Sequence, residues 1–212
     1  MGNRSLLVVG VTGFILGVVF TLQSRPTVLE FGAESWMPSM VSISIVREIG
    51  PVITALICAG RISSGIGAEL GSMRVTEQID AMEVSGTNPF KYLVVTRILA
   101  ATLMIPLLII FGDAIALLGS ALVEYLKGDV SFQLYFNSAF DALEYSDINP
   151  AIIKSFFFGF AIGLVGSYKG YTCTRGTVGV GEASNSAVVF TSMLLFVIDF
   201  IAVFVTDIFT EI

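Results

Sequence analysis

Apolar residues gather into five long runs along the chain, and shorter polar segments separate these runs. A run of about 20 apolar residues is long enough to cross a hydrocarbon core of about 30 Å as an α-helix. The pattern therefore predicts an all-α integral membrane protein with about five transmembrane helices in a single domain, residues 1–212. The predicted spans are 5–23, 38–71, 92–125, 152–168 and 183–205.

The first apolar run resembles a secretory signal peptide in one respect, because the basic residue Arg4 precedes it. The run is longer than the apolar region of a signal peptide, and Thr21–Arg25 offers no small-x-small cleavage site. We therefore predict a retained transmembrane helix that ends before Arg25 and Pro26.

Composition excludes several classes of function. Only 13% of the 212 residues are charged, against about 25% in a typical soluble domain, so lipid contact must replace a wet surface. The net charge of -6, without a basic run, argues against a nucleic-acid partner. The sequence contains no His, the commonest general base and metal ligand, and no phosphate-binding loop. We expect no catalytic residues, no metal and no cofactor, and we expect Cys58 and Cys173 to be free thiols.

Basic residues predict the orientation of the chain. If the N-terminus lies inside, the inner segments hold most of the 11 basic residues, including Arg61, Arg74 and Lys91. Several of these residues lie within spans. The bias nevertheless predicts a cytoplasmic N-terminus and a periplasmic C-terminus, in a bacterial inner membrane.

The second span carries charges where hydrocarbon is expected. Arg47 and Glu48 follow Pro38 by enough residues to lie roughly 14 Å into the membrane if the helix is straight. Each buried charge costs about 2.5 to 3.5 kcal/mol on insertion scales, and adjacent helical residues do not face each other. Water, a third charged residue or a polar ligand must compensate them, so the pair is either functional or part of an ion pair that joins helices. Gly50 and Pro51 predict a bend beside these charges, because proline cannot donate a hydrogen bond to the carbonyl of Arg47.

Two further carboxylates lie in apolar surroundings. Asp199 is the most isolated charge in the sequence, and an unpaired carboxylate there would bind a proton or a cation. Our hypothesis is that it faces the same cavity as Arg47 and Glu48. Asp113 is a weaker candidate of the same kind.

Small residues recur at every fourth position of the second span and let another helix approach closely. This contact is either packing within the subunit or a contact between subunits. The small residues, called the ladder below, are Ala55, Ala59, Ser63, Gly67 and Gly71.

The polar segment 74–89 has the pattern of a short amphipathic helix between the second and third spans. Val75, Ile79 and Met82 form one stripe, and acidic residues lie off it. Such a helix suits either the membrane surface or a groove in a partner, and its acidic residues favour a protein partner. Gly86–Pro89 ends the segment.

Two other polar segments are predicted from local pattern. Phe132, Phe136, Phe140 and Leu143 recur at helical spacing and predict a helix on the outer surface, between the third and fourth spans. Its apolar stripe would cap the bundle. The glycine-rich stretch 176–181 is interpreted as a flexible turn.

Several motifs closely resemble the MlaE family of permeases, which belong to ABC transporters associated with MCE-domain proteins. The resemblance covers nearly the whole chain and is most specific in its long central run. One departure is that family members usually have an amphipathic helix before the first span, whereas here the span follows Arg4 almost immediately. The matching stretches are 47–51, 59–61, 68–82, 88–89, 92–94 and 179–183.

The resemblance implies a homodimer that binds two copies of a cytoplasmic ABC ATPase and lies below a periplasmic MCE-domain protein. It implies movement of phospholipids or related lipids between membranes. Arg47, Glu48 and Asp199 match positions of the lipid-binding cavity, and residues 76–86 match the cytoplasmic coupling helix. The coupling residues implied in this way are Glu77, Gln78, Ile79, Asp80, Met82 and Glu83.

We therefore expect a permease subunit whose transport is driven by a separate ATPase. The alternative from another class is a proton- or ion-coupled secondary transporter that uses Arg47, Glu48 and Asp199. A third alternative is a scaffold that only anchors a partner and would tolerate loss of its intramembrane charges.

Overall fold

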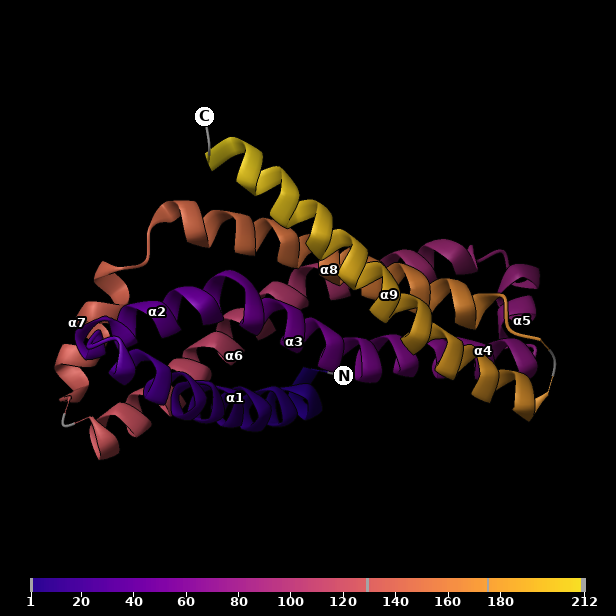
Figure 1. Ribbon diagram of the computed structural model, residues 1–212. Coiled ribbons are helices and arrows are strands. Elements are labelled where there is room, and N and C mark those ends of the chain that lie inside the picture. Colours follow the sequence, from indigo (N-terminus) through magenta and orange to yellow (C-terminus); the bar gives the residue numbers. More distant parts are fainter. Residues whose placement is uncertain (1, 129, 175, 211–212) are drawn as a thin grey trace. The chain divides into compact units, whose positions relative to one another are not determined.

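The computed structural model describes residues 2–128, 130–174 and 176–210, and every secondary-structure element in these ranges is helical (Figure 1). A short 3₁₀ helix, η1, covers Glu34–Trp36, and three π-helical turns interrupt the α-helices: η2 (Ile45–Ile49), η3 (Ala59–Ser63) and η4 (Phe90–Val95). The α-helices are α1 (Gly2–Glu30), α2 (Met37–Ser44), α3 (Gly50–Cys58), α4 (Ser64–Val75), α5 (Gln78–Val84), α6 (Thr96–Lys127), α7 (Phe132–Asp141), α8 (Tyr145–Tyr171) and α9 (Thr177–Thr210).

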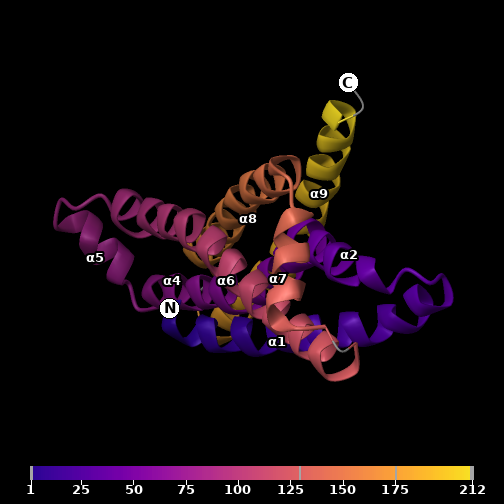
Figure 2. The same ribbon diagram turned by 90° about the vertical axis from the view of Figure 1, so that its left-hand side faces the viewer.

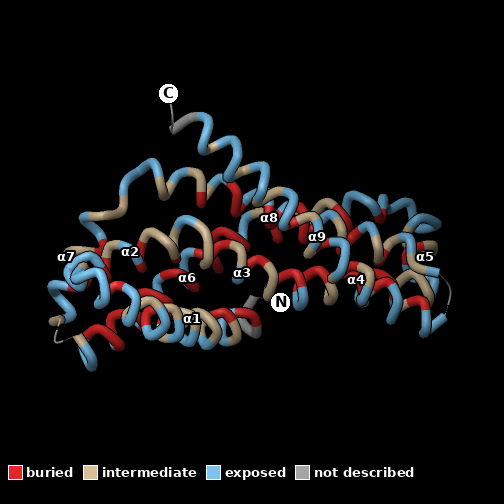
Figure 3. Tube along the Cα trace, in the orientation of Figure 1, coloured by how far each residue is buried: buried red, intermediate tan, exposed pale blue. Residues whose placement is uncertain are grey.

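Five helical stretches are long and apolar enough to cross a membrane, which confirms the predicted all-helical class and number of spans. Many apolar residues of α6 and α9 are exposed, which suits contact with hydrocarbon rather than water. Figure 3 colours exposed residues pale blue along the trace of the chain. The five stretches are Ser5–Glu30, Glu34–Val75, Phe90–Lys127, Tyr145–Tyr171 and Thr177–Ile208.

The ends of three helices differ from the sequence-based prediction. Helix α1 continues through Pro26 to Glu30, because Arg25 is held by side-chain contacts to α6 rather than marking an exit to water. Helix α8 begins at Tyr145 and contains Pro150, so the polar segment before the fourth span is partly helical. Helix α9 begins at Thr177, so most of the glycine-rich stretch forms its first turns, and the prediction of a flexible turn there was wrong.

The chain forms two compact units. Unit 1 comprises residues 55–106 and 154–209, and unit 2 comprises residues 2–54 and 107–153. The boundaries between them fall inside α3, α6 and α8, so these helices contribute residues to both units.

In unit 2, α1 and α6 approach closely at glycine. A Cβ at Gly17 would collide with the carbonyl oxygen of Ala116, so only glycine permits this contact. Further along, the Thr21 hydroxyl donates to Ser120 Oγ at 2.7 Å, and the Tyr135 hydroxyl donates to the same oxygen at 2.7 Å. All three side chains are buried, and burial raises the pKa of Tyr135 to about 12. This chain of hydroxyl groups joins α1, α6 and α7.

Helix α7 packs against α2, as Figure 2 shows, and one member of the predicted stripe, Phe136, packs against the buried cluster that contains Met37 and Val41 of α2. The buried residues of α7 are Tyr135 and Ala139, whereas Phe132 and Phe140 are exposed. The predicted helix is confirmed, but periodicity did not identify the polar anchors of its other face. Those anchors are the Tyr135 hydroxyl and the carbonyl of Ala139, which accepts from the buried Ser42 hydroxyl at 3.2 Å.

In unit 1 the ladder is buried along its whole length. Ser63 Oγ lies 2.8 Å from the hydroxyl oxygen of Thr191 on α9, and a Cβ at Gly67 would be 3.4 Å from Ala187 Cβ. From the other side, α8 lies so close that a Cβ at Gly166 would be 2.8 Å from the carbonyl oxygen of Ser63. In the described structure these contacts are with helices of the same chain.

The buried pair of Arg25 and Glu124 supports a prediction about stability. Arg25 Nη1 lies 2.9 Å from Glu124 Oε2, and Arg25 Nη2 donates to the Lys127 carbonyl at 2.7 Å. We expect Glu124→Gln to destabilise the protein by about 3 to 5 kcal/mol, because it leaves a buried guanidinium without its counter-charge. The double variant Arg25→Met/Glu124→Leu should recover most of this loss, and thermal unfolding of the purified protein in detergent measures both. A Glu124→Gln variant as stable as the original protein would contradict the prediction.

Candidate functional site

The charges of the second span lie on a π-helical turn. Residues Ile45–Ile49 form η2, and the Gly50 N–H donates to the Ile45 carbonyl, five residues earlier. Pro51 has no N–H for the carbonyl of Arg47, so a regular α-helical hydrogen bond is impossible at this point. The sequence predicted a bend at this point, and the structure has a widened turn there. Such turns occur frequently at functional sites.

The Arg47 guanidinium is paired with Asp147 of α8, within unit 2. Nη1 of Arg47 lies 3.5 Å from Oδ1 of Asp147, and the Arg47 side chain is 45% exposed while that of Asp147 is 13% exposed. This is a long and accessible contact, so it contributes little to stability. Asp147 was not among the predicted site residues, although its position shortly before the fourth span was a usable signal.

Asp113 packs against the same turn. A Cβ at Gly50 would collide with the Asp113 carboxylate, which is buried within unit 2. Glu48, the neighbour of Arg47, is half-buried. Thus the widened turn brings Arg47 and Gly50 together with two acidic side chains, Asp147 and Asp113, that are far away in the sequence.

In unit 1, Asp199 of α9 forms an ion pair with Lys154 of α8. The two charged groups lie 3.0 Å apart, and their side chains are 14% and 4% exposed, respectively. The sequence predicted that a carboxylate here would bind a proton or a cation, and in the structure that cation is Lys154. Lys154 follows Ile152 and Ile153 in an apolar run, and a cation inside a span was the signal that could have identified the partner.

Arg47 and Glu48 belong to unit 2, whereas Asp199 belongs to unit 1. The hypothesis that Asp199 faces the same cavity as Arg47 and Glu48 therefore stays a prediction. No group of three or more His, Cys, Asp or Glu side chains among the described residues is placed to hold a metal ion.

The amphipathic segment is shorter than predicted. Helix α4 ends at Val75, and the chain then turns through Glu77, whose φ of 59° lies in the left-handed region, before α5 begins at Gln78. Val75 therefore does not belong to the same helix as Ile79. The turn is held together by Arg74 Nη1, which lies 2.6 Å from Asp80 Oδ1.

The exposed face of α5 differs from its apolar stripe. Ile79 is fully buried and Met82 half-buried, so both pack inward. Glu77, Gln78 and Glu83 are exposed. Val84 is 90% exposed, and the sequence analysis did not select it because it lies outside the stripe.

The cysteines are free thiols, as predicted. Cys58 is buried and Cys173 is half-buried. Partial burial and, to a smaller extent, the negative charge of Glu182 raise the pKa of Cys173 above its ordinary value. The thiolate form is therefore scarcer at neutral pH.

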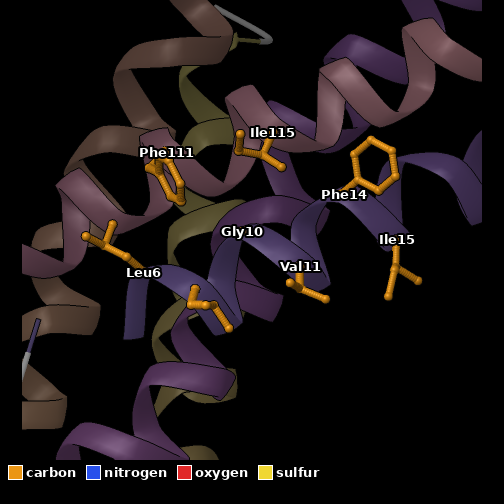
Figure 4. A pocket seen from close by; sticks show the side chains of 8 residues that line it. Leu6, Gly10, Val11, Phe14, Ile15, Phe111 and Ile115 are labelled. Atoms are coloured by element: carbon orange, nitrogen blue, oxygen red, sulfur yellow. The ribbon is translucent and has the colours of Figure 1, made fainter. Parts of the chain in front are cut away.

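An apolar groove of about 650 Å³ lies between α1 and α6 in unit 2 (Figure 4). Phe14 and Phe111 are among the side chains in its lining, and Gly10 also borders it. The lining has no polar side chain, so the groove offers nothing that could recognise a polar headgroup.

Residues 1–205 match the family described as Permease MlaE. The chain is 40% identical over 212 residues to a probable ABC transporter permease protein of Rickettsia prowazekii, covering all of this chain and 81% of the relative. It is 34% identical over 200 residues to a probable ABC transporter permease protein of Synechocystis, covering 94% of this chain and 76% of the relative.

A third relative is the chloroplastic protein TRIGALACTOSYLDIACYLGLYCEROL 1 of Arabidopsis thaliana. The identity is 36% over 200 residues, which cover 94% of this chain and 57% of that protein. The family match includes the widened turn at Arg47, both ion-paired carboxylates Asp147 and Asp199, and α5. The chain therefore belongs to the MlaE family and is the permease subunit of an ABC transporter, not itself an enzyme.

Proposed function

We propose that this permease moves phospholipids or related lipids between membranes as a homodimer in a bacterial inner membrane. In this proposal the N-terminus and α5 lie in the cytoplasm, where ABC ATPase subunits bind, and α7 and the C-terminus lie in the periplasm, near an MCE-domain protein. The observation that carries the proposal is a solvent-accessible guanidinium on a widened turn inside an apolar span of an ABC permease. The name of the Arabidopsis relative, which refers to a glycolipid, supports lipid as the substrate class.

Arg47 is suited to bind a lipid phosphate. A guanidinium binds phosphate through parallel hydrogen bonds, and these are stronger than bonds between neutral groups. At 3.5 Å its contact with Asp147 is long enough for an arriving phosphate to replace it at little cost. Asp147 thus compensates the charge of Arg47 while no lipid is bound. The N–H groups of Arg47 can then donate to the phosphate of a lipid that enters the site.

Glu48 and Asp199 complete the proposed set of substrate-binding residues. Asp199 differs from Arg47, because its ion pair with Lys154 is short and almost fully buried. Breaking that pair would leave a charge uncompensated in a medium of low dielectric constant. We propose that Asp199 acts only together with Lys154, as a paired dipole that a zwitterionic headgroup can approach.

The exposed face of α5 is the proposed contact with the ATPase. The predicted coupling residues divide into Ile79 and Met82, which hold α5 on its own subunit, and Glu77, Gln78 and Glu83, which are accessible. Asp80 serves the fold as well, because it pairs with Arg74. Val84 adds an apolar side chain to the accessible face.

The first test separates binding of lipid from a helix-joining ion pair. We expect Arg47→Gln to lower phospholipid transfer between vesicles by about 10- to 100-fold, because charge-assisted hydrogen bonds to the lipid are lost. Asp147→Asn should stay within about threefold of the original protein, because the exposed pair is weak. Both variants should still assemble with the ATPase.

Equal losses in the two variants would favour the helix-joining role and remove Arg47 from the substrate site. Glu48→Ala should impair transfer and leave assembly intact. If lipid transfer proceeded in vesicles without the ATPase and followed a proton gradient, the permease proposal would give way to the secondary transporter.

The second test concerns α5. We expect Val84→Asp to weaken ATPase binding about tenfold, because it puts a charge at the centre of an apolar contact. Glu77→Lys, which reverses an exposed charge, should also reduce lipid-stimulated ATP hydrolysis. The matched control is Val178→Asp at another exposed valine, in α9 of the same unit, and this variant should bind the ATPase normally. ATPase binding to the permease in nanodiscs measures all three, and unchanged binding and hydrolysis in Val84→Asp and Glu77→Lys would count against a coupling role for α5.

A further inference from the structure

A hollow of about 350 Å³ lies where the end of α5 meets the end of α8, within unit 1. Its lining consists of Glu83, the turn formed by residues 86–89, Phe90 and Tyr171, and we call Glu83 and this turn its rim. None of these residues except Glu83 belongs to the predicted coupling set. The two aromatic rings meet edge to face, with centroids 6.5 Å apart and an angle of 86° between their planes.

The turn at the rim is rigid. Gly86, with φ of +77°, ends α5 in a Schellman motif: its N–H donates to the Glu83 carbonyl, and the Thr87 N–H donates to the Met82 carbonyl, both at 3.0 Å. Asn88 Oδ1 then accepts from the Lys91 N–H at 3.2 Å, which caps the next helical turn. The hollow is therefore formed before any partner binds, and a partner does not have to order it.

The negative charge of Glu83 has the wrong sign for its position at the end of a helix. Glu83 lies in the last turn of α5, where the helix dipole favours a cation, and that turn contains no basic residue. Among the described residues Glu83 takes part in no ion pair, with Lys91 or with any other cation, while Arg74, Arg97 and Lys169 of the same unit contact Asp80, Glu69 and the ring of Phe190. A position that breaks a local rule without compensation within its own chain points to a role in function.

We propose that this hollow receives a basic side chain of the ATPase subunit, held by the Glu83 carboxylate and by the rings of Phe90 and Tyr171. The inference rests on the proposed contact between α5 and the ATPase. A guanidinium or ammonium group suits the hollow because it pairs with the carboxylate, offsets the end of the helix dipole and is attracted to aromatic faces. The negative rim disfavours an anionic lipid headgroup at the same place.

Binding of the purified ATPase to the permease in nanodiscs tests the proposal. Glu83→Gln and Tyr171→Leu should each raise the dissociation constant about three- to tenfold, because they remove the ion pair and the aromatic contact, respectively. The effect of Glu83→Gln should shrink at high salt, which screens an accessible ion pair. Tyr171→Phe keeps the ring and Glu182→Gln removes an exposed carboxylate elsewhere in unit 1, so both should bind as the original protein does.

The outcomes distinguish this inference from the proposal beneath it. If Val84→Asp weakens binding while Glu83→Gln and Tyr171→Leu do not, the hollow is not a binding site, although α5 still binds the ATPase. If the original protein does not bind the ATPase, both the proposed contact at α5 and the proposed site in the hollow are wrong. A photo-crosslinking residue at Thr87 gives an independent test: an adduct with a basic segment of the ATPase supports the inference, and adducts with lipid alone overturn it.

Discussion

A charge inside hydrocarbon must be compensated, and this constraint organises the polar residues of the fold. The charged pairs inside or beside the spans differ in how well they meet it. Arg25 with Glu124 and Lys154 with Asp199 are short, mostly buried pairs, and each of them joins two helices. The contact of Arg47 with Asp147 is longer and more accessible. Distance and burial thus distinguish these ion pairs more clearly than residue type does.

The second constraint is close contact between backbones. Hydrocarbon provides no hydrophobic force between helices, so van der Waals contact and hydrogen bonds must hold them. Glycine at Gly17 and Gly166 lets a neighbouring backbone come within contact distance, and the hydroxyl groups of Ser63 and Thr191 meet at the same kind of interface. Small residues and hydroxyls together do what large apolar side chains do in a soluble core.

Hydropathy alone was enough to predict the number of spans, because each backbone polar group in lipid must be satisfied within its own helix. The ends of helices were harder to predict. Pro26 and Pro150 lie inside helices, although proline lacks the N–H that an interior helical position uses. The partners of Arg47 and Asp199 come from α8, and no local pattern pairs one span with another. On α7 the stripe did not identify Tyr135 for the same reason, since that residue is buried through a hydrogen bond to α6.

The π-helical turn η3 has a consequence for how the ladder is counted. Residues four apart differ by about 40° in direction around the axis of an ideal α-helix. A small residue at every fourth position therefore moves steadily towards the opposite face of the helix. Residues Ala59–Ser63 form a wider turn with more residues per revolution, and the step across it rotates in the opposite sense. The drift is thereby partly reversed, and every member from Ala55 to Gly71 stays covered by neighbouring helices. A helical wheel drawn through this stretch at constant pitch would misplace Ser63, Gly67 and Gly71 relative to Ala55 and Ala59.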